Sequence, residues 1–426
     1  MQGIGENYLS AFALLLHAAP VQIGLLSALP QLVGTWSQLA SVKALNWLQQ
    51  RKALIVGGAS LQAALWLPLV TLPLLFPEHA PWLLILCAVA YFASGHFTVP
   101  AWNSLITDLV HPERRGAYFA RRSTIMAIAN FLALCTAGVV LHWAESEGVL
   151  WAGFLAVFLT AGAARAFSSY CLARIDETAV PPTRETDLRF IPFLLQDRQR
   201  NFRRFLLFSG LMHVCVLISG PYFVVYMLRD LHFSYLEYTF WLAAGVLGQF
   251  LSLKPWGHFG DRFGNKRVLL VTGCFVPFLP MAYLLSTALA AVVTINFFGG
   301  VVWAGFGLAL QNYVFDTVRP EDRAKGVAVW NTVNAAGWFA GAMFGGWLAG
   351  VLPTDLAWTG LSLPLASNLQ LVFCISGLLR LLVSASLLGT FAETRTVEPA
   401  SRREMVTHLP LVKPLVDVLG GRDSRQ

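Results

Sequence analysis

Eleven apolar segments of about 20 residues or more divide this 426-residue chain and limit what it can fold into. Segments of this length can cross the hydrocarbon core of a bilayer as α-helices, because a helix satisfies all of its own backbone hydrogen bonds. Residues 1–17 are apolar enough for a twelfth helix but too short to cross alone. The pattern predicts an all-α polytopic membrane protein. The segments lie at residues 20–42, 53–76, 82–110, 123–142, 149–173, 205–228, 233–256, 268–287, 290–318, 327–351 and 368–391.

The composition agrees with this prediction and excludes other classes. Hydrophobic residues make up 56% of the chain and charged residues only 12%, and the mean hydropathy of +0.60 is too high for one anchor on a soluble domain. The net charge of +7 is not gathered into a basic patch with interleaved aromatic residues, so we expect no nucleic-acid partner. The six cysteines are scattered singly, without metal-ligand spacing. We therefore expect no disulfide, metal site or cofactor.

The basic residues predict the orientation, because Lys and Arg are retained on the cytoplasmic side of short loops. They fall in alternate loops if residues 1–17 count as a crossing. All but three of the 30 basic residues then lie on one side; Arg229 lies on the other, and Arg165 and Arg380 lie inside helices. We expect a multi-pass protein of the plasma (inner) membrane with both termini in the cytoplasm.

The only long hydrophilic connector divides the chain into two halves. It predicts an N-terminal bundle at residues 1–173, a cytoplasmic linker at 174–204, a C-terminal bundle at 205–392 and a cytoplasmic tail at 393–426. The halves also match each other. "NSLITDLVHPERR" in the first half corresponds to "QNYVFDTVRPEDR" in the second and pairs Asp108 with Asp316. Three further matches follow the same order along both halves, which indicates a duplicated six-helix unit.

The stretch "GHFGDRFGNKR" between the eighth and ninth predicted helices makes a family resemblance specific. With six plus six helices and a charged central linker, the chain resembles the major facilitator superfamily of secondary transporters. Its loop motif is matched by Gly257, Gly260, Asp261, Arg262, Gly264, Lys266 and Arg267. The resemblance implies two pseudo-symmetric six-helix bundles. The chain departs from the pattern in the loop "KALNWLQQRK", which lacks the acidic residue and the glycines. It also departs in helix 1, which is cut short, so we expect the start at Met1 to be internal.

The resemblance implies a cytoplasmic gate at the loop with Asp261. A carboxylate can cap the positive end of a neighbouring helix, and the family places that neighbour at the start of helix 11 or of helix 5. The contact would hold the inner side shut and break as the bundles rock. The alternative is a basic cytoplasmic loop with glycines that only form turns.

Six further charged residues are candidates for structural ion pairs: Asp108, Arg115, Arg165, Asp316, Arg323 and Arg380. The two aspartates lie near the inner ends of helices 4 and 10, where Arg115, Arg323 or other loop cations could pair with them. Arg165 and Arg380 lie deep in helices 6 and 12, where an unpaired charge costs a few kcal/mol. They need partners, for which Asp108 and Asp316 are candidates. We favour structural clamps over substrate ligands.

The family places its transport path between helices 1, 4, 7 and 10. Glu6 is the only carboxylate expected near the middle of the membrane, where a buried carboxylate can take up a proton. It is our candidate for proton coupling, and the alternative is a glutamate that packs helices together. His96 and His213 are more typical of core histidines than of proton relays. The candidates for the path are Glu6, Asn7, His96, Asn103, His213, Gln311 and Asn312.

The sequence therefore predicts a monomeric secondary active transporter that moves a small solute by alternating access, coupled to protons. An enzyme would need a nucleophile with a base, or clustered metal ligands, and none occur together. A sensor derived from a transporter, or a lipid flippase, is the remaining alternative, since the first-half loop motif is weak and helix 1 is short.

Overall fold

The computed structural model describes residues 1–48, 50–176, 190–353, 366–395 and 397. In this part of the chain the elements are helices and there is no strand. The all-α prediction is confirmed. Most of the predicted tail, 393–426, and the middle of the predicted linker, 174–204, lie outside the described residues.

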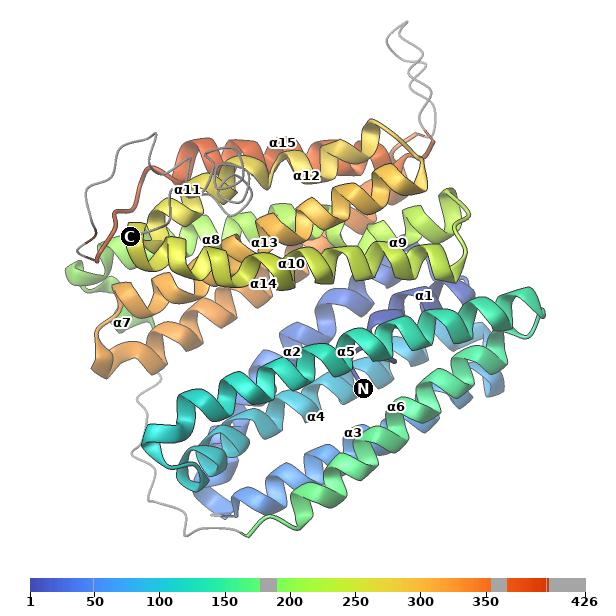
Figure 1. The fold of residues 1–426 in the computed structure, drawn as a ribbon, viewed down its shortest axis with the longest axis horizontal. Helices are drawn as coiled ribbons and strands as arrows, with labels where there is room; N and C mark the ends of the chain where they lie inside the picture. Colours follow the sequence, from blue (N-terminus) through green and yellow to red (C-terminus); the bar gives the residue numbers. More distant parts are fainter. Residues whose placement is uncertain (49, 177–189, 354–365, 396, 398–426) are drawn as a thin grey trace, which may run out of the picture. The chain divides into compact units, whose positions relative to one another are not determined.

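The helices of the first half follow the predicted segments closely (Figure 1). Residues 1–17 form a short 3-10 turn, η1 (Glu6–Tyr8), and the helix α1 (Leu9–Leu15). The long helices are α2 (Pro20–Leu48), α3 (Arg51–Leu75), α4 (Ala80–Leu109), α5 (Arg115–Ser146) and α6 (Leu150–Ala173).

The second half begins with a short helix in the predicted linker, α7 (Phe190–Leu195). Predicted helix 7 is α8 (Arg200–Ser219) followed by α9 (Phe223–Val225) and a π-turn at Tyr226–Asp230, and predicted helix 9 is α11 (Asn265–Phe275) followed by α12 (Phe278–Met281). Prolines explain the breaks, because Pro221 and Pro277 lack the N–H that a continuing helix needs. The remaining long helices are α10 (Tyr235–Phe263), α13 (Leu289–Thr317), α14 (Arg323–Val351) and α15 (Leu369–Leu387).

Eight helical stretches of the described residues are long and apolar enough to cross a membrane. They include α3, α4, α6, α13 and α15 whole. The duplication is also visible at the ends of the first helix of each half. His17 and His232 are the two non-glycine residues with positive φ in the described chain, at 56° and 53°, and each follows that first helix. This left-handed conformation stops a helix sharply.

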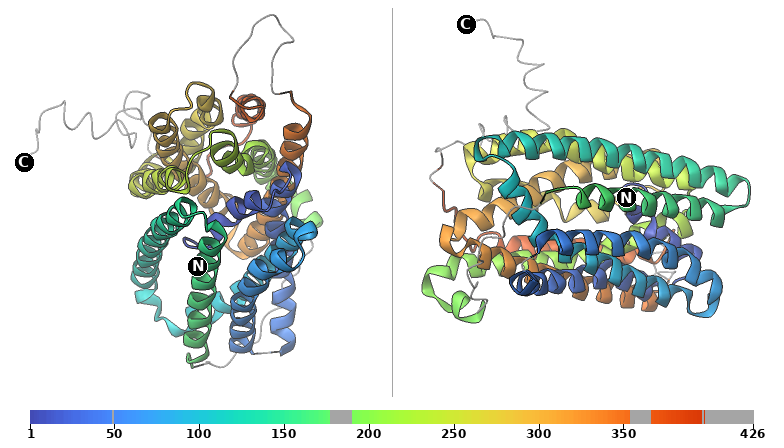
Figure 2. Two further views of the ribbon diagram at one scale, coloured as in Figure 1. Left: turned by 90° about the vertical axis from the view of Figure 1, so that its right-hand side faces the viewer. Right: turned by 90° about the horizontal axis from the view of Figure 1, so that it is seen from below.

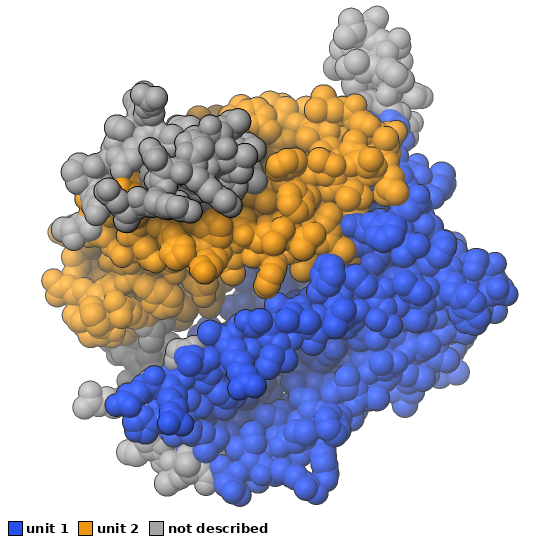
Figure 3. Space-filling model, viewed as in Figure 1, with its two compact units in different colours: residues 1–187, 217–240, 335–372 blue, residues 188–216, 241–334, 373–426 orange. Residues whose placement is uncertain are grey.

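The chain forms two compact units (Figure 3). Unit 1 contains residues 1–187, 217–240 and 335–372, and unit 2 contains 188–216, 241–334 and 373–426. The units reflect the contacts of one conformation, whereas the predicted bundles at 1–173 and 205–392 follow the repeat. The two divisions therefore need not coincide, and the bundle boundaries stay a prediction.

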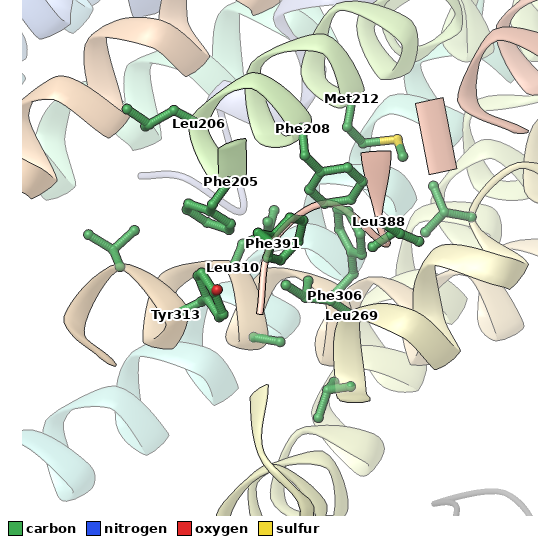
Figure 4. Close-up of a cluster of buried hydrophobic side chains, with 14 of the residues drawn as sticks. Phe205, Leu206, Phe208, Met212, Leu269, Phe306, Leu310, Tyr313, Leu388 and Phe391 are labelled. Carbon is green, nitrogen blue, oxygen red and sulfur yellow. The ribbon is translucent and has the colours of Figure 1, made fainter. Parts of the chain in front are cut away.

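Within unit 1, α2 and α3 pack against α4, and α6 packs against α3 and α5; these helices can be followed in Figures 1 and 2. Unit 2 has a core of aromatic and aliphatic side chains (Figure 4). In it, Phe391 lies beyond the end of α15 and contacts Phe205, Phe208 and Tyr313, with ring centroids 5.7, 5.5 and 5.2 Å away. Leu388 and Phe391, which follow α15, are thus part of this core.

Candidate functional site

The carboxylate of Glu6 is held inside unit 1 by the helix next to it in the predicted path. Glu6 opens the short turn η1 and is partly buried. Its Oε1 accepts a hydrogen bond of 2.7 Å from the hydroxyl of Tyr91 in α4. The ring of Tyr91 packs edge-on against Trp66 of α3, at 5.1 Å between centroids, and both rings are buried. The structure therefore gives Glu6 a defined phenol partner that the sequence did not indicate.

Arg165 belongs to the same cluster. Its guanidinium interacts electrostatically with Glu6 and with Tyr91, and its Nε is a buried nitrogen without a hydrogen-bond partner. Gln62 of α3 donates to the backbone carbonyl of Tyr91 at 3.1 Å, while its own Oε1 is buried without a partner. Two polar atoms of the cluster therefore have no hydrogen-bond partner within the protein.

The two deep arginines do not find the partners that we expected. Arg380 is 3% exposed and donates to the backbone carbonyls of Val276 and Val216, both at 3.2 Å, and Arg165 lies with Glu6. The expected pairings with Asp108 and Asp316 are wrong for a physical reason: the aspartates lie at helix ends, where they bind the helix next to them. Arg380 keeps a structural role by bonding the freed carbonyls of broken helices.

The two repeated aspartates have equivalent positions in the structure. Asp108 forms an ion pair of 2.5 Å with Arg51, the first residue of α3, whose side chain is 0% exposed. Asp316 accepts a hydrogen bond of 2.6 Å from Asn265, the first residue of α11. In both halves, an aspartate near the end of one helix therefore holds the start of another.

Arg115, the predicted partner of Asp108, has a different role. It donates to the backbone carbonyls of Val110 and Thr107, at 3.1 and 2.7 Å, and so closes the end of α4. Arg323 is exposed at the first residue of α14. The cation that pairs with Asp108 in the structure is Arg51.

The gate motif is helical where a loop was expected. Residues 257–263 are the last turns of α10, and Gly264 alone joins them to α11. Gly264 has a φ of +92°, a backbone conformation that residues with a Cβ atom rarely adopt. This glycine lets the chain turn from α10 into α11 without a longer loop. Asp261 and Arg262 are exposed, and the guanidinium of Arg262 lies 5.1 Å from the ring centroid of Phe263. Gly257 and Gly260 lie on the helix, and Arg267 is partly buried.

Lys266 differs most in its surroundings from Asp261 and Arg262 of the same motif. It is buried, its ammonium donates to the carbonyl of Leu388, and it lies 3.4 Å from the ring centroid of Phe391. Its backbone N–H donates to Glu393 Oε2 at 2.9 Å, so this carboxylate caps the start of α11. Thr394 in turn donates to the carbonyl of Asp316. We call residues 388–395 the strap. The sequence did not indicate it, because Glu393 is a single acidic residue just after a helix.

The path candidates of the second half lead to a second polar cluster, in unit 2. His213 of α8 contacts the carbonyl of Ser209 through Nδ1 at 2.7 Å. The hydroxyl of Ser209 donates to Asn334 Oδ1 at 2.9 Å and accepts from Trp330 at 3.1 Å. Sequence analysis missed these three partners, and only the spacing of Trp330 and Asn334 on one face of α14 could have indicated them.

The remaining candidates differ in exposure. Asn7 and Asn312 are partly buried, whereas Asn103 and Gln311 are exposed. His96 lies against Gly34 of α2. Glu6, Asn7, His96 and Asn103 belong to unit 1, and His213, Gln311 and Asn312 belong to unit 2. Among the described residues, no group of three or more His, Cys, Asp or Glu could hold a metal ion.

Segments from both predicted halves meet inside unit 1. The hydroxyl of Tyr8 lies 2.8 Å from Thr239 Oγ1 and donates to the carbonyl of Leu134 at 2.9 Å. The backbone N–H of Tyr235 donates to Glu145 Oε2 at 3.2 Å. These contacts join the first helix and α5 to the start of α10.

Comparison with known proteins decides the family. A sequence model of the Major Facilitator Superfamily matches residues 205–422, just over half of the chain. The chain belongs to the major facilitator superfamily. It is therefore a multi-pass membrane protein of a solute-transporter family, as its motif, repeat and helices predicted.

Similar proteins agree on the fold. The nucleoside transporter NupG matches with a TM-score of 0.67 at 13% identity, over 90% of this chain and 94% of that chain. A D-xylose–proton symporter matches with a TM-score of 0.66 at 13% identity, over 93% and 94%. In sequence, a probable peptide/nitrate transporter from Arabidopsis thaliana is 27% identical over 135 residues, which span 30% of this chain and 28% of that protein.

Proposed function

We propose that this protein is a secondary active transporter that moves a small solute by alternating access and couples the movement to protons through Glu6. The observation that carries the proposal is the short bond between Glu6 and Tyr91 beside Arg165 and Trp66. A carboxylate in such a place can exchange a proton while a phenol and a guanidinium adjust to its charge. We also propose that the protein is a monomer in the inner membrane and that both of its termini lie in the cytoplasm.

The contacts between the two predicted halves support the alternating-access part. The hydroxyl of Tyr8 lies 2.8 Å from that of Thr239, and the backbone N–H of Tyr235 donates to Glu145. Contacts of this kind can close a path on one side of a membrane and still open at a cost of a few kcal/mol. In the predicted topology they lie at the end opposite the basic loops.

The test is transport by the purified full chain in proteoliposomes with an imposed proton gradient. The panel contains sugars, nucleosides, amino acids and small organic anions. Glu6→Gln keeps the size and an acceptor for Tyr91 but cannot titrate. We expect it to lose gradient-driven accumulation and to retain exchange of solute without a gradient. The matched control is Glu147→Gln, which changes an exposed glutamate between α5 and α6.

Two results would contradict the proposal. Accumulation by Glu6→Gln equal to that of the unaltered protein would remove Glu6 from coupling. Absence of any solute movement by the folded, unaltered protein would refute transport and favour the sensor or flippase.

A further inference from the structure

A groove lies between α3 and α6 of unit 1 and shares Trp66 with the surroundings of Glu6. Its volume is about 750 Å³, which is within the range of roughly 300–1,000 Å³ that is usual for small-molecule sites. The two helices lie side by side, and both are apolar enough to cross a membrane (Figure 1). The groove opens to the surface, because three of its lining residues, Leu67, Tyr170 and Leu159, are 55%, 53% and 44% exposed.

The groove is suited to a hydrocarbon chain. Its lining contains no charged residue and consists mainly of alanine, glycine and aliphatic side chains. The two serines in it satisfy each other: Ser60 and Ser169 lie 2.8 Å apart, and Ser169 also bonds the carbonyl of Val56 at 3.3 Å. The donor protons of both serines are therefore used within the protein, which lowers the cost of placing an apolar chain beside them.

The length of the groove matches one leaflet. On α3 the lining runs from Val56 to Leu67, and on α6 it runs from Leu159 to Ala173. At a helical rise of about 1.5 Å per residue, these stretches are roughly 17 and 21 Å long. Half of a hydrocarbon core is about 15 Å thick. A lipid tail that entered from the cytoplasmic surface would therefore end near Trp66, the buried ring that also packs against Tyr91.

The mouth of the groove carries a positive charge. Arg174 is exposed directly after α6, and its guanidinium lies 4.7 Å from the ring centroid of Tyr170, which lines the groove. Lys52 lies one helical turn before Val56 on α3. Basic residues next to a tail-binding groove at the predicted cytoplasmic surface complement the phosphate of an anionic lipid.

We propose that this groove binds one anionic phospholipid, with an acyl chain between α3 and α6 and its headgroup at Arg174. The site is not part of the proposed solute path. The lipid fills the space that small side chains leave between the two helices, and its tail supports the outer side of Trp66. Bound lipid thereby stabilises the packing of Trp66 against Tyr91, the partner of Glu6.

The test counts bound lipid by native mass spectrometry on the purified full chain. The probes are phosphatidylglycerol and phosphatidylcholine with identical chains, added in competition. We expect the unaltered protein to retain one phosphatidylglycerol in preference to phosphatidylcholine. Ala166→Trp fills the groove and should abolish retention of both lipids. The matched control is Ala164→Trp, at an exposed alanine of the same helix that does not line the groove.

The headgroup contact has its own variant. Arg174→Glu should reduce the preference for phosphatidylglycerol at least fivefold, since a basic residue near an anionic surface contributes about 1 kcal/mol. Arg319→Glu, at an exposed arginine of unit 2, is the control for charge and should leave the preference unchanged. If Ala166→Trp fails to fold, as judged by gel filtration, Ala163→Leu fills the same groove with a smaller side chain.

Three outcomes would overturn the proposal. The first is equal retention of the two lipids by the unaltered protein. The second is equal retention of phosphatidylglycerol by Ala166→Trp and Ala164→Trp. The third is a dimer that Ala166→Trp separates into monomers without a change in bound lipid, which would make the groove an interface between two copies.

Discussion

At the scale of single residues, Gly138 shows how closely α5 approaches the start of α10 within unit 1. A Cβ atom at this position of α5 would lie 2.1 Å from Thr239 Oγ1, so glycine is the only residue that fits without movement. The hydroxyl of Thr239 cannot move freely, because it also contacts Tyr8 and donates to the carbonyl of Tyr235 at 2.7 Å.

Gly138→Ala should therefore destabilise the protein by about 1–3 kcal/mol, the usual cost of overpacking. The measurement is thermal unfolding of the purified protein in detergent. Gly57→Ala is the matched control, because a Cβ atom there meets no atom within 4 Å and alanine favours the helix. A melting temperature of Gly138→Ala at or above that of Gly57→Ala would show that the contact between Gly138 and Thr239 is not tight.

At the scale of elements, the strap connects helices that are distant in sequence. Besides its contacts with α11, the strap accepts a hydrogen bond of 2.8 Å from Arg204 of α8 at the carbonyl of Thr390, and the hydroxyl of Tyr313 in α13 donates to Ala392. Three helices of unit 2 thus depend on one short segment after α15.

Phe391→Ala should lower the free energy of unfolding by about 3 kcal/mol, because it leaves a cavity among buried aromatic rings. Chemical denaturation in detergent, followed by tryptophan fluorescence, would measure the change. Phe278→Ala removes the same atoms from a side chain that is 54% exposed and should have little effect. If the two variants lose similar stability, the strap is not part of the core.

At the scale of the whole molecule, both halves keep the aspartate contact at the start of a helix, but only one half keeps the loop motif. Both use an aspartate to hold the start of a helix, through Arg51 in the first half and Asn265 in the second. Only the second half retains the glycines and the acidic residue of the loop motif. Any gate at this motif therefore acts from one half.

Asp261→Asn should slow transport in the proteoliposome assay more than Gln50→Asn does. Gln50 lies in the first-half loop "KALNWLQQRK", which corresponds to the motif around Asp261. The reason is that a carboxylate can cap a helix and then release it, whereas an amide lacks the charge. Gln49, the neighbouring position, lies outside the described residues. Equal transport rates in the two variants would contradict a gating role for Asp261.

Much of the fold and part of the site could be predicted from the sequence. Helix positions followed from apolar segments, because segment length and composition are local properties that a bilayer constrains directly. A loop cation as the partner of Asp108 was expected from its position near the inner end of helix 4. The choice of Arg51 over Arg115 could not be predicted, since Arg51 is 57 residues from Asp108 in the sequence and only the packing of α3 against α4 brings them together.

Hydropathy, charge and motifs are properties of the local sequence, and they were enough to predict a duplicated, all-helical membrane protein of the major facilitator superfamily. Which polar side chains meet depends on how the helices pack. Tyr91 joins Glu6, Glu393 caps α11, and small residues of α3 and α6 leave a groove. Each depends on helices distant in the chain, and the distance between two side chains on separate helices is not encoded in the local pattern of either one.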